Sequence, residues 1–515
     1  MTGSAVASPH RLSAEAGRHI LTQGGNAADA AVAVVAAQGV VAPETCGLGG
    51  DLFALVHQPG WDQPRALNAS GQAGSRVDAG RLREAGAIEI GRDDPESVTI
   101  PGCVDGLVAL IEKHGSKSLG DVLEPAITLA EEGFEVSSEQ NRAFRMQADH
   151  YRDNPAVADF YPGGLAVEAG DAVSRPALAH TLRDLAGGGR AAFYGGTAGE
   201  DIVAAIHDIQ PVDLETNQAE WVEPIGVEVG GLTAWTPPPN SQGYLGPATL
   251  AVMSLLEAPT DPADPMWWHL MIEAYRCLAW ERDDVVADSS HAPLPAHLLM
   301  DRDRLARAAL TVDRYRAGTW PRMDHLTDTA YMCVADAQGM AVSVIQSNYA
   351  GTGSFFGAAR SGFLLQNRGS GFTLTPGHPN ELAPGKRPLH TLAPTLWTEG
   401  DRSRWIIGTR GGAVQPQLVA QLAARAILDG SSLEAAQLAP RWTVSDFGPG
   451  SPPSARLEPG VPAAIVKDLR SRGHEIEVME GPQPGWGPMS IIELAGEERR
   501  SAPDPRVETT AALVF

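Results

Sequence analysis

The first part of the chain shows apolar positions with helical spacing. Residues 13–22 follow this pattern until Gly24 and Gly25 interrupt it, so a helix is predicted before the glycines. Asn26 then suits a helix N-cap, and Asp29 is acidic at the third helical position, near the positive end of the helix dipole. We therefore predict a second helix through the small residues that follow, which allow close packing.

Two later segments of the first half also have helical periodicity. Residues 117–136 are amphipathic and Gly133 ends them, and residues 267–283 repeat apolar positions at helical spacing. Residues 236–246 are rich in proline and glycine and predict a rigid loop. The first half is therefore predicted to be mainly helical.

The second half has a different pattern. Residues 329–335 and 340–347 are apolar and flank a four-residue turn, which indicates a β-hairpin. The first of these strands is apolar at consecutive positions, so we expect it to be covered on both faces. Residues 403–430 predict a strand, a glycine-rich turn and a helix. Sheets covered by helices follow from this pattern, which is typical of a layered α/β fold.

Length and charge narrow the possibilities. A chain of 515 residues exceeds one ordinary core, so we expect two domains or one large layered α/β unit. The net charge is −24, and no block of lysine and arginine interrupts it. This balance argues against nucleic acid or an anionic membrane as a partner.

Cysteine spacing and the first residues bear on location. The four cysteines are scattered without a C-x-x-C pair, which favours a reducing compartment over a disulfide framework. The N-terminal residues lack the continuous apolar stretch of a signal peptide. We therefore expect a soluble cytoplasmic protein. The fourteen histidines have no metal-ligand spacing, and the common hydrolase, P-loop and dinucleotide motifs are absent, so no metal or cofactor is predicted.

Asp328 and Thr329 stand at the start of the predicted hairpin. A threonine there is compatible with strand propensity alone. The alternative is that chain cleavage before Thr329 creates a free α-amino group, which would serve as the base for its own hydroxyl nucleophile. The pattern by itself leaves both readings open.

The glycine-rich turn at residues 408–412 is a second candidate. Backbone N–H groups in a turn before a helix suit an oxyanion, although a tightly packed turn would need the same glycines. The segments 24–33 and 46–53 are also dense in small residues, and for these we favour packing. Cys333 is predicted to be a core residue.

Taken together, these segments resemble the γ-glutamyltransferase family of N-terminal-nucleophile hydrolases. The family order runs through GGNAADAAVA, ETCGLGGDLF, TIPGCVDGL, LEPAITLAEEGFEV and PPPNSQG to DTAYMCVADAQGMAVSV, and then through GKRPLHTLAPT, GTRGG and DPRVETTAA. The resemblance covers nearly the whole chain. It implies a four-layer αββα sandwich and self-cleavage between Asp328 and Thr329. The resulting subunits, residues 1–328 and 329–515, would stay associated.

The resemblance also implies positions for the reaction. Thr329 would attack an amide carbonyl to form an acyl-enzyme, and the N–H groups of Gly411 and Gly412 would hold the oxyanion. Ser347 falls where the family usually has a second threonine that hydrogen-bonds the nucleophile. His390 and Thr391 replace a pair of small hydroxyl residues in the substrate pocket, and the histidine is a departure.

Further departures concern the grip on a γ-glutamyl group. The family's arginine for the α-carboxylate is replaced at Ser70, with no arginine nearby in the sequence, and its acidic residue for the α-amino group is replaced by Gly371. Arg368 and Arg410 are the alternative ligands for a substrate carboxylate. For both arginines a purely structural reading stays open.

The resemblance therefore implies a metal-free threonine amidohydrolase acting on a small-molecule amide, with hydrolysis favoured over transfer. A γ-glutamyl compound such as glutathione is the family substrate. Hydrolysis of a small dicarboxylic monoamide such as oxamate, or of an acyl side chain as in cephalosporin acylases, is the alternative. Because Ala330 stands where many members have another threonine, an uncleaved, non-catalytic binding relative is a second alternative. The sequence leaves a homo-oligomer open.

Overall fold

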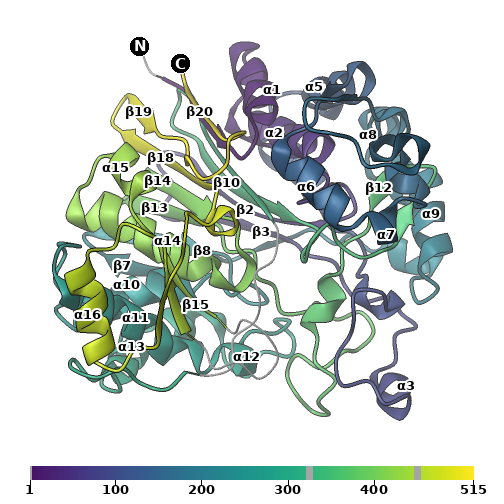
Figure 1. Ribbon diagram of the computed structural model, residues 1–515. Coiled ribbons are helices and arrows are strands. Elements are labelled where there is room, and N and C mark those ends of the chain that lie inside the picture. Colours follow the sequence, from purple (N-terminus) through teal and green to yellow (C-terminus); the bar gives the residue numbers. More distant parts are fainter. Residues whose placement is uncertain (1–2, 321–328, 446–453) are drawn as a thin grey trace.

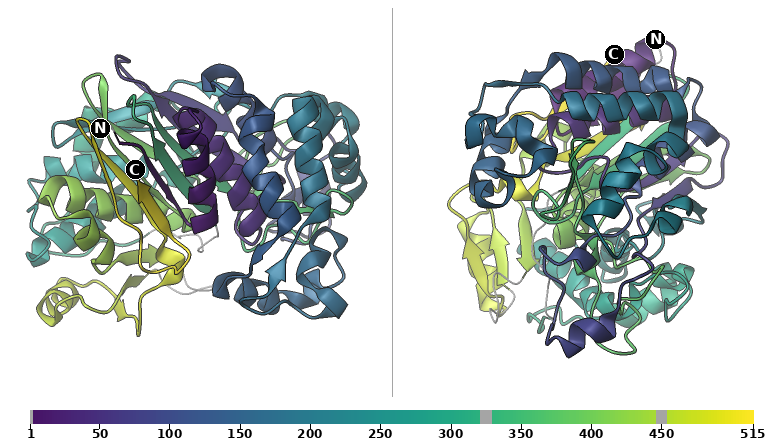
Figure 2. Two further views of the ribbon diagram at one scale, coloured as in Figure 1. Left: turned by 90° about the horizontal axis from the view of Figure 1, so that it is seen from above. Right: turned by 90° about the vertical axis from the view of Figure 1, so that its right-hand side faces the viewer.

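The computed structural model describes residues 3–320, 329–445 and 454–515. Two large β-sheets lie face to face between two layers of helices (Figures 1 and 2). The first sheet has the strand order β20 (Ala511–Val514), β1 (Ala5–Ser8), β9 (Ala330–Ala335), β10 (Ala341–Ser347), β2 (Asp51–His57), β3 (Arg65–Ala69), β6 (Glu220–Val222). The second has the order β19 (Glu498–Ser501), β18 (Met489–Ala495), β14 (Arg402–Thr409), β13 (Thr395–Glu399), β8 (Leu232–Thr236), β7 (Ile225–Val229).

Strand β9 shows how the sheets pack. Tyr331 and Cys333 point into the core between the sheets, where they join Ile406 of β14. Met332 and Val334 alternate with them and enter the core beneath the helices. The predicted burial of this strand on both faces is confirmed, and Cys333 is a core residue as expected.

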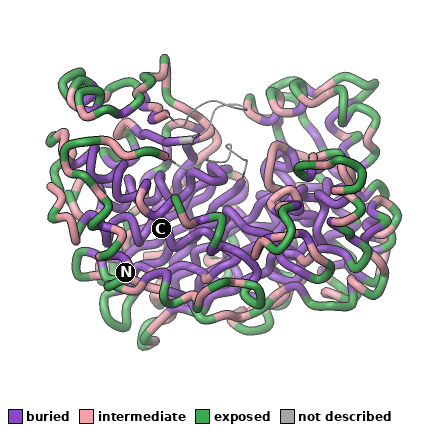
Figure 3. Tube along the Cα trace, turned by 90° about the horizontal axis from the view of Figure 1, so that it is seen from below, coloured by how far each residue is buried: buried purple, intermediate pink, exposed green. Residues whose placement is uncertain are grey.

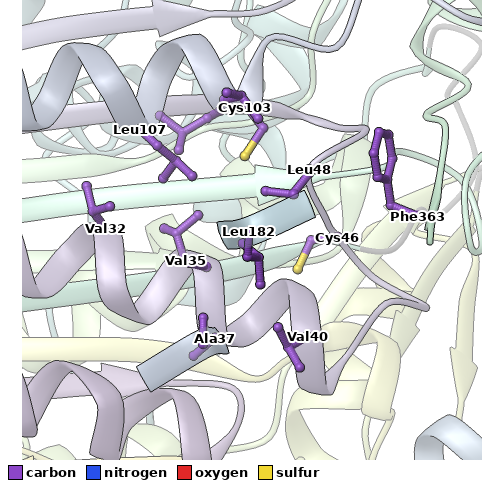
Figure 4. Close-up of a cluster of buried hydrophobic side chains, with 14 of the residues drawn as sticks. Val32, Val35, Ala37, Val40, Cys46, Leu48, Cys103, Leu107, Leu182 and Phe363 are labelled. Carbon is purple, nitrogen blue, oxygen red and sulfur yellow. The ribbon is translucent and has the colours of Figure 1, made fainter. Parts of the chain in front are cut away.

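The helices outside the first sheet are built from small and branched residues. They include α1 (Arg11–Thr22), α2 (Ala27–Val41), α4 (Cys103–His114), α5 (Leu119–Glu132) and α8 (Pro176–Tyr194). The predicted cap of α2 is confirmed, because Asn26 and Asp29 form a reciprocal capping box. Figure 4 shows the core of this layer, where Val35 of α2 lies with Leu107 of α4 and Leu182 of α8.

The second helical layer covers the other sheet. It includes α10 (Leu245–Leu255), α11 (Pro265–Ala279), α14 (Gln415–Ala423) and α16 (Ala463–Ser471), which share one apolar core with that sheet. The helix predicted at 267–283 ends earlier, and a separate short helix, α12 (Arg282–Val285), follows it. The four-layer αββα sandwich is therefore confirmed as one layered unit.

The other helices and strands complete the structure. The helices are α3 (Ala79–Glu84), α6 (Ser138–Met146), α7 (Ala148–Tyr151), α9 (Thr197–Ala205), α13 (Arg302–Ala309) and α15 (Leu433–Leu438). The strands are β4 (Phe134–Glu135), β5 (Ala172–Val173), β11 (Gly357–Ala358), β12 (Phe363–Leu364), β15 (Trp442–Ser445), β16 (Ser454–Leu457) and β17 (Ile476–Val478). Figure 3 shows a continuous buried interior under an exposed rim. In the described ranges no helix has both the length and the apolar character needed to cross a membrane.

The strands on the two sides of residue 328 are interleaved. In the first sheet β1 pairs with β20 on one edge and with β9 on the other, both antiparallel. In the second sheet β8 pairs with β13. The ends of the described chain also meet, because the Ser4 N–H donates to the Phe515 carbonyl at 2.7 Å. Each part of the chain therefore completes the sheets of the other.

The two sheets approach closely where β9 begins and β14 ends. A Cβ atom added to Gly408 would lie 2.3 Å from the Tyr331 ring, so only glycine allows this contact. Ser490 Oγ of β18 also donates to the Tyr331 carbonyl, at 3.3 Å. Tyr331 is the second residue of β9 and Gly408 the second-last of β14, so these strand ends lie opposite each other.

We expect Gly408→Ala to lower the free energy of unfolding by about 1–3 kcal/mol, because the new methyl group overpacks the interface between the sheets. Gly187→Ala in α8 is the matched control, since no heavy atom of the described residues lies within 4 Å of its added Cβ. That variant should unfold like the wild type or at slightly higher denaturant. The measurement is urea unfolding, and equal midpoints for Gly408→Ala and the wild type would contradict the described contact.

Candidate active site

Thr329 lies directly before β9 and is buried, with 1% of its surface exposed. Its Oγ1 donates a hydrogen bond to Ser347 Oγ at 3.1 Å. Ser347 ends β10, whose pairing with β9 sets Gln346 opposite Ala330. The structure thus brings together Thr329 and Ser347 as the resemblance implied. Asp328, the other half of the predicted cleavage site, lies outside the described residues.

Ser347 joins the nucleophile candidate to the next loop. Its Oγ accepts the Tyr349 N–H at 2.8 Å, and its backbone pairs with Asp51 at the start of β2. Tyr349 has a positive φ of 78°, which is uncommon for a residue with a side chain. This turn brings the Tyr349 ring against Arg368.

The Gly411–Gly412 turn follows β14 and precedes α14. Gly411 has φ 125° and Gly412 has φ 55°, conformations that favour glycine. Because Gly408 packs on Tyr331, the turn lies near the start of β9 and therefore near Thr329. Backbone N–H groups at such a turn suit a developing oxyanion. Their use in catalysis stays a prediction.

Gln242 links this turn to a second loop. Its Nε2 donates to the carbonyls of Gly412, at 3.0 Å, and Thr391, at 3.2 Å. Its Oε1 accepts the Arg282 Nε–H at 2.9 Å, which fixes the amide orientation. The sequence pattern predicted only a loop here, so this positioning residue was missed.

Arg368 is fully buried and contacts Tyr349 in one loop and Thr391 in another. Its Nη1 donates to Thr391 Oγ1 at 3.1 Å, and its guanidinium carbon lies 3.8 Å from the centre of the Tyr349 ring. Burial lowers the pKa of Arg368 to about 10, so the guanidinium is protonated at neutral pH. Its Nε and Nη2 have no hydrogen-bond partner among the described residues.

His390 forms a buried pair with Asp51. His390 Nε2 lies 3.0 Å from Asp51 Oδ2, and the Leu392 N–H donates to Nδ1 at 3.3 Å, which assigns the ring proton to Nε2. Burial, with the Arg368 charge, lowers the pKa of His390 to about 4, so the ring is neutral at pH 7. The sequence interpretation assigned the segment containing Asp51 to packing and missed this contact.

Arg410 is held by other partners. It forms an ion pair with Glu139 at 2.5 Å, donates to the Pro484 carbonyl at 3.0 Å, and also bonds the Gly487 carbonyl. These contacts match the structural reading of Arg410 that the sequence left open. They anchor the residue that immediately precedes the Gly411–Gly412 turn to α6.

Ser70 has an arginine neighbour that the sequence did not suggest. Its hydroxyl donates to Asn68 Oδ1 at 2.7 Å, while its carbonyl accepts the Arg387 Nε–H at 3.0 Å. The sequence segment around Ser70 has no such arginine, but in space Arg387 lies beside it, because a loop more than three hundred residues later folds back here. Arg387 also bonds Glu220 Oε2 and the Gln218 carbonyl, both at 2.9 Å, so its guanidinium is occupied.

Comparison with known proteins gives consistent results. The gamma-glutamyltranspeptidase family profile matches residues 13–514. A "glutathione hydrolase-like YwrD proenzyme" from Bacillus subtilis is 34% identical over 99% of this chain and 98% of that protein. An "oxamate amidohydrolase proenzyme" from Klebsiella pneumoniae is 33% identical over 99% and 98%. The crystal structure of a cephalosporin acylase from Bacillus halodurans superposes with a TM-score of 0.91 at 30% identity, covering 99% of this chain and 96% of that one.

The neutral state of buried His390 predicts a pH dependence of stability. The pKa of His390 is about 4 in the folded protein and 6.5 in the unfolded chain, so the neutral ring contributes its full stabilisation of the fold above pH 6.5. This contribution is lost as the pH falls towards 4. Between pH 7 and 5 the loss is about 2 kcal/mol. We expect His390→Gln to lose that much less than the wild type in urea unfolding. Parallel pH curves for the two proteins would contradict the prediction.

Proposed function

The chain belongs to the gamma-glutamyltranspeptidase family, and we propose that Thr329 is its nucleophile in the hydrolysis of a small-molecule amide. The observation that carries this proposal is the buried Thr329 hydroxyl, hydrogen-bonded to Ser347 at the start of a strand covered on both faces. The cytoplasmic location and the oligomeric state stay predictions.

The reaction begins with the chain itself. Cleavage of the peptide bond before Thr329 gives this residue a free α-amino group, whose usual pKa near 8 makes it a base at neutral pH. The amine takes the proton of Oγ1 as Oγ1 attacks the amide carbonyl. The Gly411 and Gly412 N–H groups stabilise the oxyanion. The C–N bond breaks, the leaving amine takes the proton, and an acyl-Thr329 ester remains.

Water completes the cycle. The α-amino group removes a proton from the water as its oxygen attacks the ester carbonyl, and the acid leaves as Thr329 Oγ1 is protonated again. The burial of the nucleophile and the pairing of β9 with both neighbours keep the hydroxyl in one position between the two steps.

The interleaved strands support a mature protein of two associated subunits, residues 1–328 and 329–515. Strand β1 of the first lies between two strands of the second, and β8 of the first pairs with β13 of the second. Separating them would break backbone hydrogen bonds in both sheets and expose the shared cores.

The acyl group is a γ-glutamyl group or a related one. Curated relatives include glutathione hydrolases, an oxamate amidohydrolase and acylases, so the family accommodates several acyl groups. We favour hydrolysis over transfer because Ser70 and Gly371 replace the two charged residues expected to hold a γ-glutamyl donor. The uncleaved binding relative is the alternative that the next experiment excludes or supports.

We expect the purified protein to show two bands on a denaturing gel and Thr329→Ala to show one, because the variant lacks the hydroxyl that attacks the preceding peptide bond. N-terminal sequencing of the smaller fragment should begin Thr-Ala-Tyr. Thr22→Ala, at the exposed end of α1, is the matched control and should be cleaved normally. A single band from an amidase-active wild type would refute the mechanism.

Glu139→Gln tests how Arg410 acts. If Arg410 positions the oxyanion turn, weakening its charge-assisted bond should lower kcat about tenfold and leave KM nearly unchanged. If Arg410 instead binds a substrate carboxylate, release from Glu139 should lower KM for anionic amides alone. Steady-state kinetics with an anionic and an uncharged amide separate the two outcomes.

A further inference from the structure

Arg368 donates fewer hydrogen bonds than Arg175 and Arg441, two other deeply buried arginines. Arg175 gives three hydrogen bonds to backbone carbonyls, and Arg441 bonds Asp504, Gln437 and a carbonyl. Arg368 donates only to Thr391 Oγ1, and two of its three nitrogens have no partner among the described residues. A buried cation with unused donors is costly unless an anion is bound there.

One chain of contacts leads from Arg368 to the nucleophile. The guanidinium lies on the Tyr349 ring at 3.8 Å, and the Tyr349 N–H donates to Ser347 Oγ at 2.8 Å. The same Ser347 oxygen accepts the Thr329 hydroxyl at 3.1 Å. Two residues therefore separate the cation from the hydroxyl that attacks the amide.

A second chain of contacts leads from Arg368 to the oxyanion turn. Arg368 Nη1 bonds the Thr391 hydroxyl, and the Gln242 amide bonds the carbonyls of both Thr391 and Gly412. Contacts thus link the Arg368 guanidinium to both the nucleophile and the glycine turn. An anionic group on a short acyl chain fits this arrangement, with its carbonyl at Thr329 and its charge at Arg368.

Among the described residues, the carboxylate that acts on Arg368 is that of Asp51, and its oxygens are already engaged by other groups. Gly371 has no side chain, and a Cβ there would lie 2.8 Å from the Leu389 carbonyl oxygen. Asp51 Oδ1 accepts the Gly71 N–H at 2.8 Å and Gln366 Nε2 at 2.9 Å, and Asp51 Oδ2 bonds His390. An ammonium group next to the Arg368 cation would therefore meet repulsion without compensation.

Uncharged amide oxygens do not remove the repulsion between Arg368 and a substrate ammonium group. Asn348 Oδ1 and Gln366 Oε1 are buried and have no hydrogen-bond partner among the described residues, but both are uncharged amide oxygens. They suit an amide or hydroxyl group of a substrate better than a second cation beside Arg368.

We propose that Arg368 binds the distal carboxylate of the substrate, and that the substrate is a short dicarboxylic monoamide without an ammonium group. This rests on the proposed function, because the scissile amide is the one that Thr329 attacks. Thr391 orients the guanidinium and Tyr349 supports its face. Arg368 is a specificity-determining residue that takes no proton in the reaction, since its guanidinium stays charged throughout.

Three p-nitroanilides of matched chain length test the substrate class. Glutaryl-p-nitroanilide carries the carboxylate, γ-glutamyl-p-nitroanilide adds the ammonium group, and pentanoyl-p-nitroanilide has a methyl group in place of the carboxylate. We expect kcat/KM for the glutaryl amide to exceed both others by about tenfold or more. Equal or faster cleavage of the γ-glutamyl or pentanoyl amide would overturn the proposal.

Variants then assign the preference to one residue. In Arg368→Gln the ratio of glutaryl to pentanoyl kcat/KM should fall about 10- to 100-fold, mainly through a higher KM for the glutaryl amide, and Arg368→Lys should restore part of it. Arg404→Gln is the matched control, since Arg404 pairs with Glu399 on the surface. It should leave the ratio unchanged. An unchanged ratio in Arg368→Gln would refute the assignment, because a merely structural arginine would affect all three amides alike.

Inhibition gives a readout that does not need the variant to fold. Glutarate should inhibit the wild-type enzyme competitively at concentrations about tenfold lower than glutamate, and the reverse order would overturn the proposal. A cleaved wild-type protein that splits none of the three amides would refute the proposed function itself. Splitting without a preference would refute only this inference.

Discussion

The burial of β9 on every side is the constraint on which the site depends. The strand pairs with β1 and β10 along its edges, packs on helices through one face, and meets the second sheet through the other. Thr329, the residue directly before β9, is therefore buried and has almost no freedom to move. Ser347, the glycine turn and the Arg368 loop are positioned relative to that fixed point. Packing of the apolar layers around β9 thereby fixes the orientation of the Thr329 hydroxyl group.

Much of the fold could be predicted because the spacing of apolar residues along the chain indicates which segments form helices and strands. Consecutive apolar residues in β9 indicated a strand with two covered faces, and Asn26 with Asp29 indicated the start of α2. The family resemblance supplied the number of layers, which periodicity alone leaves undetermined. The helix predicted over 267–283 was too long, because the apolar spacing continues across a break after Ala279 that the local pattern does not signal.

Contacts in the candidate site were predictable only between residues that are close along the chain. The family resemblance pointed to Thr329 and Ser347, and because both lie on one hairpin, the register of the hairpin brings them into contact. Asp51, Gln242 and Glu139 act through partners far away in the sequence, and the local pattern around each of them does not indicate those partners. Such contacts depend on how distant loops pack together in the folded protein, so local sequence patterns cannot predict them.

The meeting of the two chain ends at one edge of the sheet has a consequence for engineering. Since the Ser4 N–H reaches the Phe515 carbonyl and β1 lies beside β20, a short linker would join these ends without disturbing a layer. The gene could then be opened before Thr329 instead. A circular permutant of this kind, after removal of its initiator methionine, would be synthesised with the reactive terminus already exposed. Maturation and turnover, which the proposed mechanism assigns to one residue, could thereby be studied apart.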